Sequence, residues 1–254
     1  MAEGSVQSVA RALTLLRLLG RTREGASVSD LARTSRLPVS TTHRLLTTLE
    51  SEGFALFDGT TRLWHVGHEA FSTGLAFDRR HALAGSALPH LRRLRDRTRE
   101  TANVGLLQDG RLVTIGQVES REIMRAIAAP GGAGVPASAS GMGKAILATW
   151  PEDAVRAHVD RHGLPPMTSK SHRDLAGLLR DLTEIRARGW ALDDEEHAPG
   201  LRCIAAVVSA SNGEATGAVS VSGLSLRLTN ARLSAVGDAV MQASDLLGRE
   251  LAGS

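Results

Sequence analysis

The sequence predicts an α+β fold, with a small winged helix-turn-helix domain followed by a larger domain built around an antiparallel sheet. Residues 27–66 show the order helix, turn, helix and hairpin, and residues from 101 onward mix short strand patterns with helices. Hydrophobic residues make up 42% of the 254 residues, which is enough to build two cores. We expect the two domains at residues 1–67 and 82–254, joined by a linker helix at 68–81.

The first helical segment, Val6–Leu19, is apolar over more than one side. Val6, Val9, Leu13 and Leu16 form a helical stripe, and further apolar residues widen it. Such a helix has to pack on its own domain and on a second copy as well. The simplest partner is the same chain in a symmetric dimer.

The helix-turn-helix comes next. The segment Ser27–Ser35 has the pattern of a short helix capped by Ser27 or Ser29. Pro38 biases the residue before it toward an extended conformation, so a second helix is expected to begin just beyond it. Gly53 is a plausible stop for that helix, whose inner face is mainly leucine.

The outer face of the second helix carries short hydroxyl side chains and one long cation, Arg44, which suit phosphates and base edges in a major groove. The segments Phe54–Phe57 and Arg62–Val66, separated by a turn, predict a hairpin that forms the wing. A small helical bundle with a hairpin is the alternative, but this order and these lengths favour DNA binding. In a dimer, two such helices would meet a palindromic operator. The residues expected to contact DNA are Ser29, Ser40, Thr41, Thr42, His43, Arg44, Thr47 and Arg62.

The rest of the chain continues the α+β pattern. Residues 67–80 predict a connector helix broken near Gly74, and the arginine-rich stretch 83–99 predicts a helix with a solvated charged face. Residues 101–118 predict a hairpin that turns at Asp109–Gly110. The remaining predicted elements are strands at 125–129, 190–193, 203–210 and 216–221, and helices at 140–148, 151–161, 171–188 and 230–250.

Composition excludes several classes of protein. No apolar run approaches the ~20 residues of a membrane span, and the first residues lack the features of a signal peptide. The single cysteine excludes an internal disulfide and agrees with a reducing compartment. We therefore expect a cytoplasmic protein that makes no membrane contact and needs no cofactor.

The segment Ser138–Ala145 is a glycine-rich entry into a helix. Backbone N–H groups at a helix start can bind carboxylate or phosphate oxygens. A nucleotide P-loop is excluded, because that motif needs glycine at position 138 and serine or threonine at position 145. Anion binding and a close-packed helix start that needs small residues both stay open.

The segment Asp193–Cys203 contains four consecutive carboxylates followed by His197 and Cys203. Adjacent strand residues point to opposite faces, so the carboxylates cannot converge as a block, and a solvated acidic loop is the usual outcome. A Cys203 nucleophile with His197 as base would make a hydrolase, but a lone cysteine in an apolar strand is more often a core residue. His158 and His162 are spaced for one metal ion but lack a third ligand, so we expect no metal site.

The segment Val219–Gly223 alternates valine and serine. A strand places Ser220 and Ser222 on one face and the valines on the other. Two hydroxyls that face an interior need polar partners or a polar ligand. The alternative is a pair of serines on a solvated face.

Together these stretches resemble the IclR family of bacterial transcriptional regulators over nearly the whole chain. The resemblance implies a DNA-binding domain with a wing, a linker helix, a GAF/PAS-like effector domain, and homodimers that commonly pair into homotetramers. The segments that carry the resemblance are Gln7–Leu13, Leu31–Ala32, Leu37–Thr41, Arg44–Leu49, Ser140–Ala145, Asp193–Glu196 and Ser220–Gly223.

Within this family, the chain is most similar to repressors of allantoin and glyoxylate utilisation. The segments with that closer likeness are Arg99–Asn103, Gln117–Glu119, Met124–Arg125 and Asp193–Cys203. The resemblance implies a repressor in purine catabolism that answers to a small ureide or 2-oxo acid, such as allantoin, allantoate or glyoxylate. The alternatives are an IclR-type regulator, activators included, of another organic-acid pathway, and a Cys203-dependent hydrolase with a DNA-binding appendage.

The resemblance also implies a binding site for the effector. Backbone amides of Gly141 and Met142 would hold a carboxylate, the serine hydroxyls would donate and accept, and Asp193 would accept from an amide or a hydrate hydroxyl. Met142 is larger than the residue expected at its position, which bears on the size of the pocket. The residues implied for effector binding are Gly141, Met142, Asp193, Cys203, Ser220 and Ser222.

Overall fold

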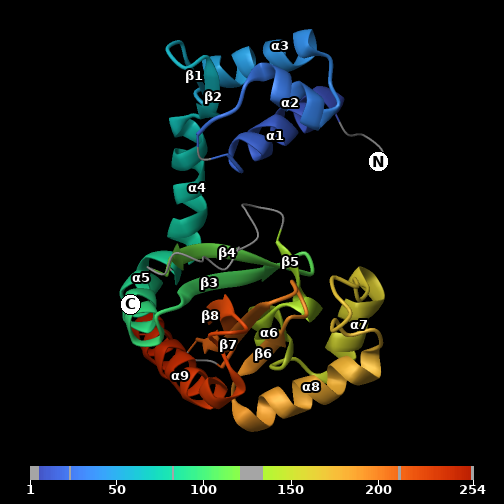
Figure 1. Ribbon diagram of the computed structural model, residues 1–254, viewed down its shortest axis with the longest axis vertical. Coiled ribbons are helices and arrows are strands. Elements are labelled where there is room, and N and C mark those ends of the chain that lie inside the picture. The colour runs from blue at the N-terminus through green and yellow to red at the C-terminus, as the bar shows by residue number, and fades with distance from the viewer. Residues whose placement is uncertain (1–5, 23, 82, 121–133, 211–212, 253–254) are drawn as a thin grey trace. The chain divides into compact units, whose positions relative to one another are not determined.

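The computed structural model describes residues 6–22, 24–81, 83–120, 134–210 and 213–252, with the backbone alone described for residues 75–81. The chain divides into two compact units, one formed by the chain up to His81 and the other by the chain beyond it (Figure 1). Among the described residues, no helix is both long and apolar enough to cross a membrane.

The first unit has the predicted order of helices followed by a hairpin. Its core is formed by residues from every element except the last helix, with Leu15, Leu46 and Trp64 at its centre. Trp64 lies on the second strand of the hairpin, so the wing is fastened to the helices by burial of its own aromatic side chain. The elements are α1 (Gln7–Leu19), α2 (Val28–Ser35), α3 (Val39–Ser51), β1 (Ala55–Asp58), β2 (Leu63–Val66) and α4 (His68–His81).

Short-range signals set the boundaries of these elements. Ser27, not Ser29, caps α2, because its hydroxyl oxygen accepts the N–H of Asp30 at 3.2 Å. Gly53 follows α3 at φ +73°, the left-handed backbone that a helix stop favours. The hairpin turn is closed by Asp58, which accepts two backbone N–H groups, and Arg62 leaves the turn at φ +58°.

The predicted break near Gly74 is wrong, because α4 runs without interruption from residue 68 to residue 81. A single glycine costs a helix about 1 kcal/mol relative to alanine but keeps its backbone hydrogen bonds. Gly67, just before α4, is required for steric reasons, unlike Gly74. A Cβ atom there would lie 2.2 Å from the carbonyl oxygen of Gly53, so only glycine allows the chain to pass.

The second unit is built on one six-stranded antiparallel sheet in the order β5-β4-β3-β8-β7-β6. The β3–β4 turn has Asp109 at φ +47° and Gly110 at φ +74°, the paired left-handed conformation of a tight hairpin. The predicted strand at 125–129 lies outside the described residues. The elements are α5 (Leu83–Thr98), β3 (Thr101–Gln108), β4 (Arg111–Val118), β5 (Val135–Pro136), the 3-10 turn η1 (Ala137–Ala139), α6 (Gly141–Leu147), α7 (Glu152–His162), α8 (Leu175–Arg188), β6 (Ala191–Asp194), β7 (Leu201–Ser209), β8 (Ala215–Leu224) and α9 (Asn230–Ala252).

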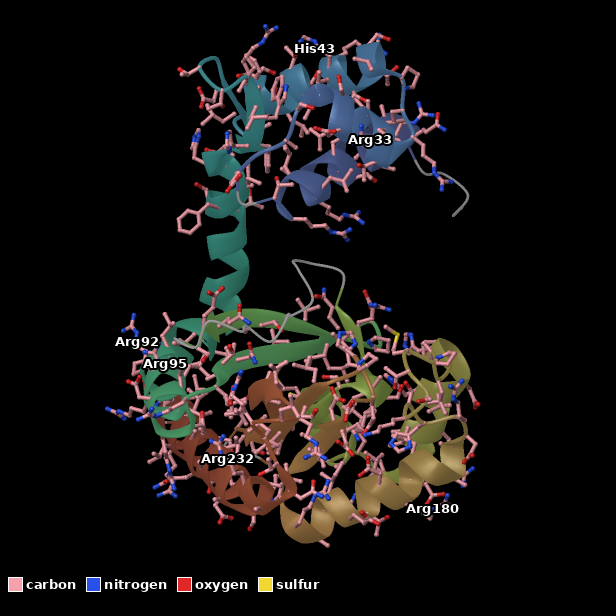
Figure 2. All side chains as sticks on the ribbon, in the orientation of Figure 1. Arg33, His43, Arg92, Arg95, Arg180 and Arg232 are labelled. Atoms are coloured by element: carbon pink, nitrogen blue, oxygen red, sulfur yellow. The ribbon has the colours of Figure 1, made fainter. Side chains whose placement is uncertain are left out.

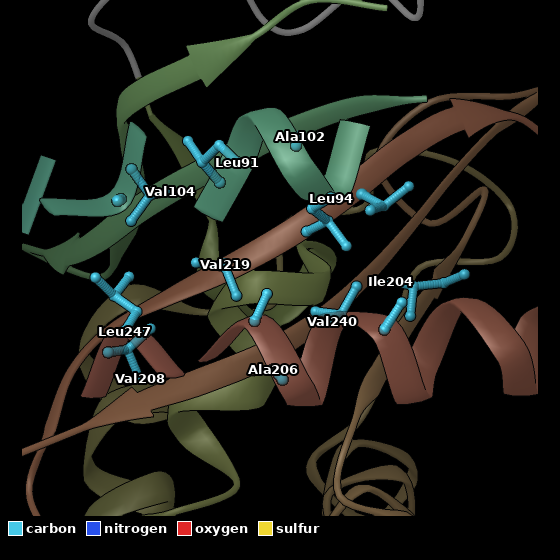
Figure 3. Packing of buried hydrophobic residues seen from close by; sticks show 14 of the residues in the cluster. Leu91, Leu94, Ala102, Val104, Ile204, Ala206, Val208, Val219, Val240 and Leu247 are labelled. Carbon is cyan, nitrogen blue, oxygen red and sulfur yellow. The ribbon is translucent and has the colours of Figure 1, made fainter. Parts of the chain in front are cut away.

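Helices cover both faces of this sheet. On one face α5 and α9 pack over residues such as Val104, Ile204 and Val219 (Figure 3). On the other face α6 and α8 pack over Ala205 and Ala218. The prediction of an α+β domain is confirmed, and the period of two along the strands decides which side chains face which helix layer.

The predicted solvated face on α5 is confirmed except at Arg95, which is half-buried and donates to the carbonyl oxygen of Glu119 at 3.2 Å. Arg92, Arg93 and Arg97 are exposed, whereas Leu91 and Leu94 are buried against the sheet (Figure 2 labels Arg92). The arginine run is thus one side of an amphipathic helix.

Candidate functional site

The polar face of α3 lies at the surface of the first unit. Ser40, His43, Arg44 and Thr47 are exposed and Thr41 is half-buried. His43, labelled in Figure 2, also makes an edge contact with Trp64 at 6.2 Å between ring centroids. Ser29 on α2 and Arg62 in the wing turn are exposed as well.

Thr42 is the exception among the residues expected to contact DNA, and the structure shows that the expectation was wrong for this residue. It is fully buried, and its hydroxyl donates to the carbonyl oxygen of Pro38 at 3.1 Å. Thr42 lies on the same helical face as Leu45 and Leu46, so packing takes precedence over its polar group. Its hydroxyl cannot reach DNA without unpacking α3.

Helix α1 presents a second surface. Leu15 and Leu19 are buried in the core of the first unit, whereas Val6, Val9 and Leu13 are 62%, 54% and 45% exposed. Val6 immediately precedes the helix, and with Val9 and Leu13 it forms an exposed apolar stripe along the first part of α1. The stripe is the surface that the sequence singled out for contact with a second copy.

In the second unit, strand register brings the predicted effector residues together on the sheet face beneath α6. One cross-strand row contains Asp193, Cys203 and Ser222, paired in that order across β6, β7 and β8. In the next row, Ser220 on β8 pairs with Asn103 on β3. These side chains alternate with the valines of the opposite core, so the two serines lie on the inner face.

Gly141 and Met142 cover this face from α6. A Cβ atom at Gly141 would lie 2.9 Å from the carbonyl oxygen of Cys203 and 3.1 Å from its Sγ. Only glycine therefore allows the start of α6 to pack this closely against β7. The Met142 side chain is buried and reaches over Gly105 of β3. The large residue at position 142 therefore fills space above the same sheet face as Ser220.

Asn103 and Gln117, which sequence reasoning did not place in the site, link the two rows. The Asn103 amide nitrogen donates to Ser220 Oγ at 3.3 Å and to Ser222 Oγ at 3.2 Å. Gln117 Nε2 donates to Asn103 Oδ1 at 2.8 Å. The period of two that singled out the serines places Thr101 and Asn103 on this face of β3, and that signal was available from the sequence.

Asp193 is buried, and its Oδ1 accepts the backbone N–H groups of Glu196 at 2.7 Å and His197 at 3.2 Å. Burial, with the nearby Glu196 carboxylate as a second cause, raises the pKa of Asp193 to about 7. Near neutral pH this carboxyl is therefore divided between its neutral and charged forms, and it can donate as well as accept a hydrogen bond.

Cys203 is buried, and burial raises the pKa of its thiol to about 11, with the Asp193 carboxylate as a second cause. The hydroxyls of Ser222 and Ser220 partly offset that rise. The hydrogen bonds of the described residues do not join Cys203 to His197, whose own pKa is lowered by burial. A thiol whose pKa is raised this far stays neutral, and the neighbouring Asp193 carboxylate raises its pKa further, so Cys203 is a poor nucleophile and the geometry disfavours the hydrolase alternative.

The four carboxylates after Leu192 separate, as expected for a strand, but they do not form a solvated loop. Asp194 pairs with Arg202 at 2.6 Å, Glu195 pairs with Lys170 at 3.0 Å, and Glu196 turns inward. The expectation of a solvated acidic loop is therefore wrong for Asp193 and Glu196. Both are buried because the interior supplies N–H donors or a cation for them.

The cation is Lys144, which is fully buried on α6. Its ammonium donates to Asp181 Oδ2 at 2.6 Å, to Glu196 Oε1 at 2.5 Å and to the carbonyl oxygen of Leu192 at 2.6 Å. Burial opposes the charged form of Lys144, but the two carboxylates outweigh burial and raise its pKa. Lys144 thus ties α6 to the segment that carries Asp193.

Histidines contribute two further features. His172 joins Asp181 at 3.1 Å, and His172, Asp181 and Glu196 each place one possible metal-ligating atom within 4.8 Å of the others. The Lys144 ammonium already balances these carboxylates, so the group is a salt-bridge network. His158 and His162 contact each other on α7 in a tilted arrangement, with ring centroids 4.9 Å apart.

A winged helix-turn-helix unit and an α+β unit with a buried polar face under a helix define a DNA-binding regulator with a sensor domain. Comparison with known proteins assigns the family. The model of the IclR helix-turn-helix domain matches residues 8–59, and that of the bacterial transcriptional regulator IclR C-terminal domain matches residues 76–249. The chain belongs to the IclR family of bacterial transcriptional regulators, and it is not an enzyme.

Several relatives are similar over nearly their whole length. The chain is 42% identical to the transcriptional regulator BhcR of Paracoccus denitrificans over 95% of this chain and 86% of that protein. It is 38% identical to the repressor IclR of Escherichia coli, over 96% and 89%, and 35% identical to the E. coli repressor AllR, over 94% and 88%. The structure of the Thermotoga maritima IclR has a TM-score of 0.80 at 26% identity and covers 96% of this chain and 98% of that one.

Proposed function

We propose that this chain is a cytoplasmic repressor whose affinity for a palindromic operator changes when a small ureide or 2-oxo acid binds its effector domain. Allantoin, allantoate and glyoxylate represent that class, which would place the target genes in purine catabolism. The observation that supports the proposal is the convergence of Asp193, Cys203, Ser220 and Ser222 on one buried sheet face beneath Gly141. A small ligand with a few polar atoms suits such a face.

A second candidate is control of another small organic-acid pathway, as repressor or activator. The greater identity to BhcR and IclR than to AllR favours it, because the allantoin assignment rested on likeness to that last type of repressor. The DNA-binding role is the same in both candidates. They differ in which small molecule occupies the effector face, in the pathway controlled, and in whether activation is included.

For assembly, we propose that the exposed stripe of Val6, Val9 and Leu13 is buried in a homodimer, and that two dimers pair into a tetramer. A dimer would offer two copies of α3 to two half-sites of an operator. Contact with DNA is proposed for Ser29, Ser40, Thr41, His43, Arg44, Thr47 and Arg62.

The test begins with selection of the operator from fragments of the source genome by the purified full-length protein. Allantoin, allantoate, glyoxylate, pyruvate and acetate are then titrated against the protein–operator complex by fluorescence anisotropy. We expect one ureide or 2-oxo acid to change operator affinity at least ten-fold, or about 1.4 kcal/mol. A response to acetate alone would favour the second candidate, and no operator at all would refute the proposal.

A further inference from the structure

We infer that Val39 is a specificity-determining residue, whose side chain covers the 5-methyl group of a thymine in each half-site of the operator. This inference rests on the proposed function, because it concerns the face of α3 that is proposed to contact DNA. It adds an apolar residue to a face that otherwise consists of polar side chains, and it names a base that each half-site must contain.

Val39 is the first residue of α3 and directly follows Pro38. Its side chain is 52% exposed, whereas Leu46, two turns further along the same helix, is fully buried. Pro38 is exposed as well, so the start of α3 presents a small apolar surface. In a helix-turn-helix, the residues at the N-terminal end of the second helix are those that contact base edges. Val39 therefore lies at the end of α3 that reads the bases.

The side chains next to Val39 on the helix surface belong to the proposed DNA face. Residues four apart lie one above the other on a helix, so Val39 and His43 form one row, and Ser40 and Arg44 form the next. All four side chains are exposed. When Ser40 and Arg44 enter a major groove, Val39 enters it with them, because it precedes Ser40 at the same end of the helix.

Among the base edges of the major groove, only that of thymine carries an apolar group. Adenine, guanine and cytosine present hydrogen-bond donors or acceptors, whereas thymine presents a 5-methyl group beside its O4 acceptor. A valine that covered a donor or an acceptor would displace water from it and supply no hydrogen bond in return. A valine that covers the thymine methyl removes two apolar surfaces from water. The side chain therefore favours thymine and disfavours the other three bases.

A single exposed valine is ordinary on a protein surface, so the position of Val39 and not its exposure carries the inference. Val66 provides the comparison, because it is 41% exposed but lies at the end of β2, outside α3. Val39→Ala and Val66→Ala each remove two methyl groups from an exposed side chain and leave no cavity in a core. Both variants should therefore fold, and they should differ only in what they do to DNA recognition.

The experiment uses the operator that the full-length protein selects, and it replaces thymine by uracil at one symmetry-related pair of positions at a time. Uracil lacks only the 5-methyl group of thymine and keeps the same base pair with adenine. The dissociation constant of each operator is measured by fluorescence anisotropy for the wild-type protein, Val39→Ala and Val66→Ala. The salt concentration is the same throughout, because affinity for DNA depends strongly on it.

For the wild-type protein, we expect uracil at one pair of positions to weaken binding about 15-fold, which corresponds to about four-fold for each methyl group lost. Val39→Ala should bind the thymine operator more weakly by a similar factor, and it should lose most of the response to uracil at that pair of positions. Val66→Ala should keep both the affinity and the response of the wild-type protein. The side chain of Val39 and the thymine methyl would then be coupled, as a direct contact requires.

Two results would overturn the inference and leave the proposed function standing. In the first, the wild-type protein binds the operator but responds to uracil at none of the thymines, a result that needs no variant. In the second, Val39→Ala keeps the full response to uracil, which would assign the methyl contact to another residue of α3, such as Thr41 or Thr47. Failure to select any operator would instead refute the proposed function itself.

Discussion

Asp193→Asn should stabilise the protein in neutral and alkaline solution, although it alters a buried polar residue. The substitution keeps the shape of the side chain and an Oδ1 atom that can still accept the N–H groups of Glu196 and His197. It removes only the charge that burial penalises. Most substitutions of a buried, hydrogen-bonded group destabilise, so the expected sign is a specific consequence of this environment.

The magnitude follows from the raised pKa of Asp193, about 7 in the folded state against an ordinary value of 3.8. Between about pH 4 and pH 7, the folded protein holds a proton that the unfolded chain has released. The free energy of unfolding therefore falls as pH rises through this window, by at most about 1.4 kcal/mol per pH unit and about 4 kcal/mol in all. The Asn variant should lack this loss and exceed the wild-type stability by a similar amount above pH 7.

The assay is urea unfolding between about pH 4 and pH 8, with a fluorescence signal from the second unit. Trp150 and Trp190 report on that unit, and a Trp64→Phe background removes the signal of the first. A pH dependence due to Glu196, whose pKa burial also raises, remains in both proteins. If the variant is less stable than wild type at pH 8, or if its free energy of unfolding depends on pH with the same slope, the pKa of Asp193 is not raised toward 7 and the electrostatic reasoning fails.

Three further predictions concern other parts of the molecule. Lys144→Met should lower the free energy of unfolding, measured in urea, by about 3–5 kcal/mol, because it leaves two buried carboxylates without a cation. Adding Glu196→Gln should restore part of that loss. Equal stability of the single and double variants would contradict this prediction. Arg44→Ala should weaken operator binding by about 1–3 kcal/mol in a gel-shift titration, whereas Arg180→Ala, exposed on α8 in the other unit, should not. Leu13→Asp should dissociate dimers without unfolding the chain, because Leu13 is 45% exposed; sedimentation velocity would show intact dimers if the stripe is not the interface.

The order of elements was predictable because each has a strong local signal. The turn at Asp109–Gly110, the stop at Gly53 and the alternation of Val219–Gly223 each correspond to one backbone geometry, and the structure contains all of them. The break near Gly74 failed because a glycine permits a bend but does not impose one. The helical spacing of Thr42 with Leu45 and Leu46 already indicated the inner face of α3, so the expectation that it contacts DNA followed its residue type and not its position.

The polar interior was harder to predict, because its partners are distant in sequence. Lys144 forms ion pairs with Glu196 and Asp181, which are 52 and 37 residues away in the sequence. The residues next to Lys144 in the sequence do not indicate that its side chain is buried. Asn103 and Gln117 lie in segments that the resemblance had singled out, yet their roles depend on the register between strands. Alternation shows which face a strand residue takes, and register, which decides its neighbours, requires the structure.

We propose that a ligand on the Asp193–Ser222 face controls the affinity of the protein for its operator. The most direct measurement titrates the effector against the protein–operator complex for wild type and for Ser220→Ala combined with Ser222→Ala. Ser244→Ala serves as control, because that buried serine lies on α9 across the sheet. We expect unchanged operator binding without effector and at least about a ten-fold loss of effector affinity in the double variant alone. A wild-type response in the double variant would contradict the claim.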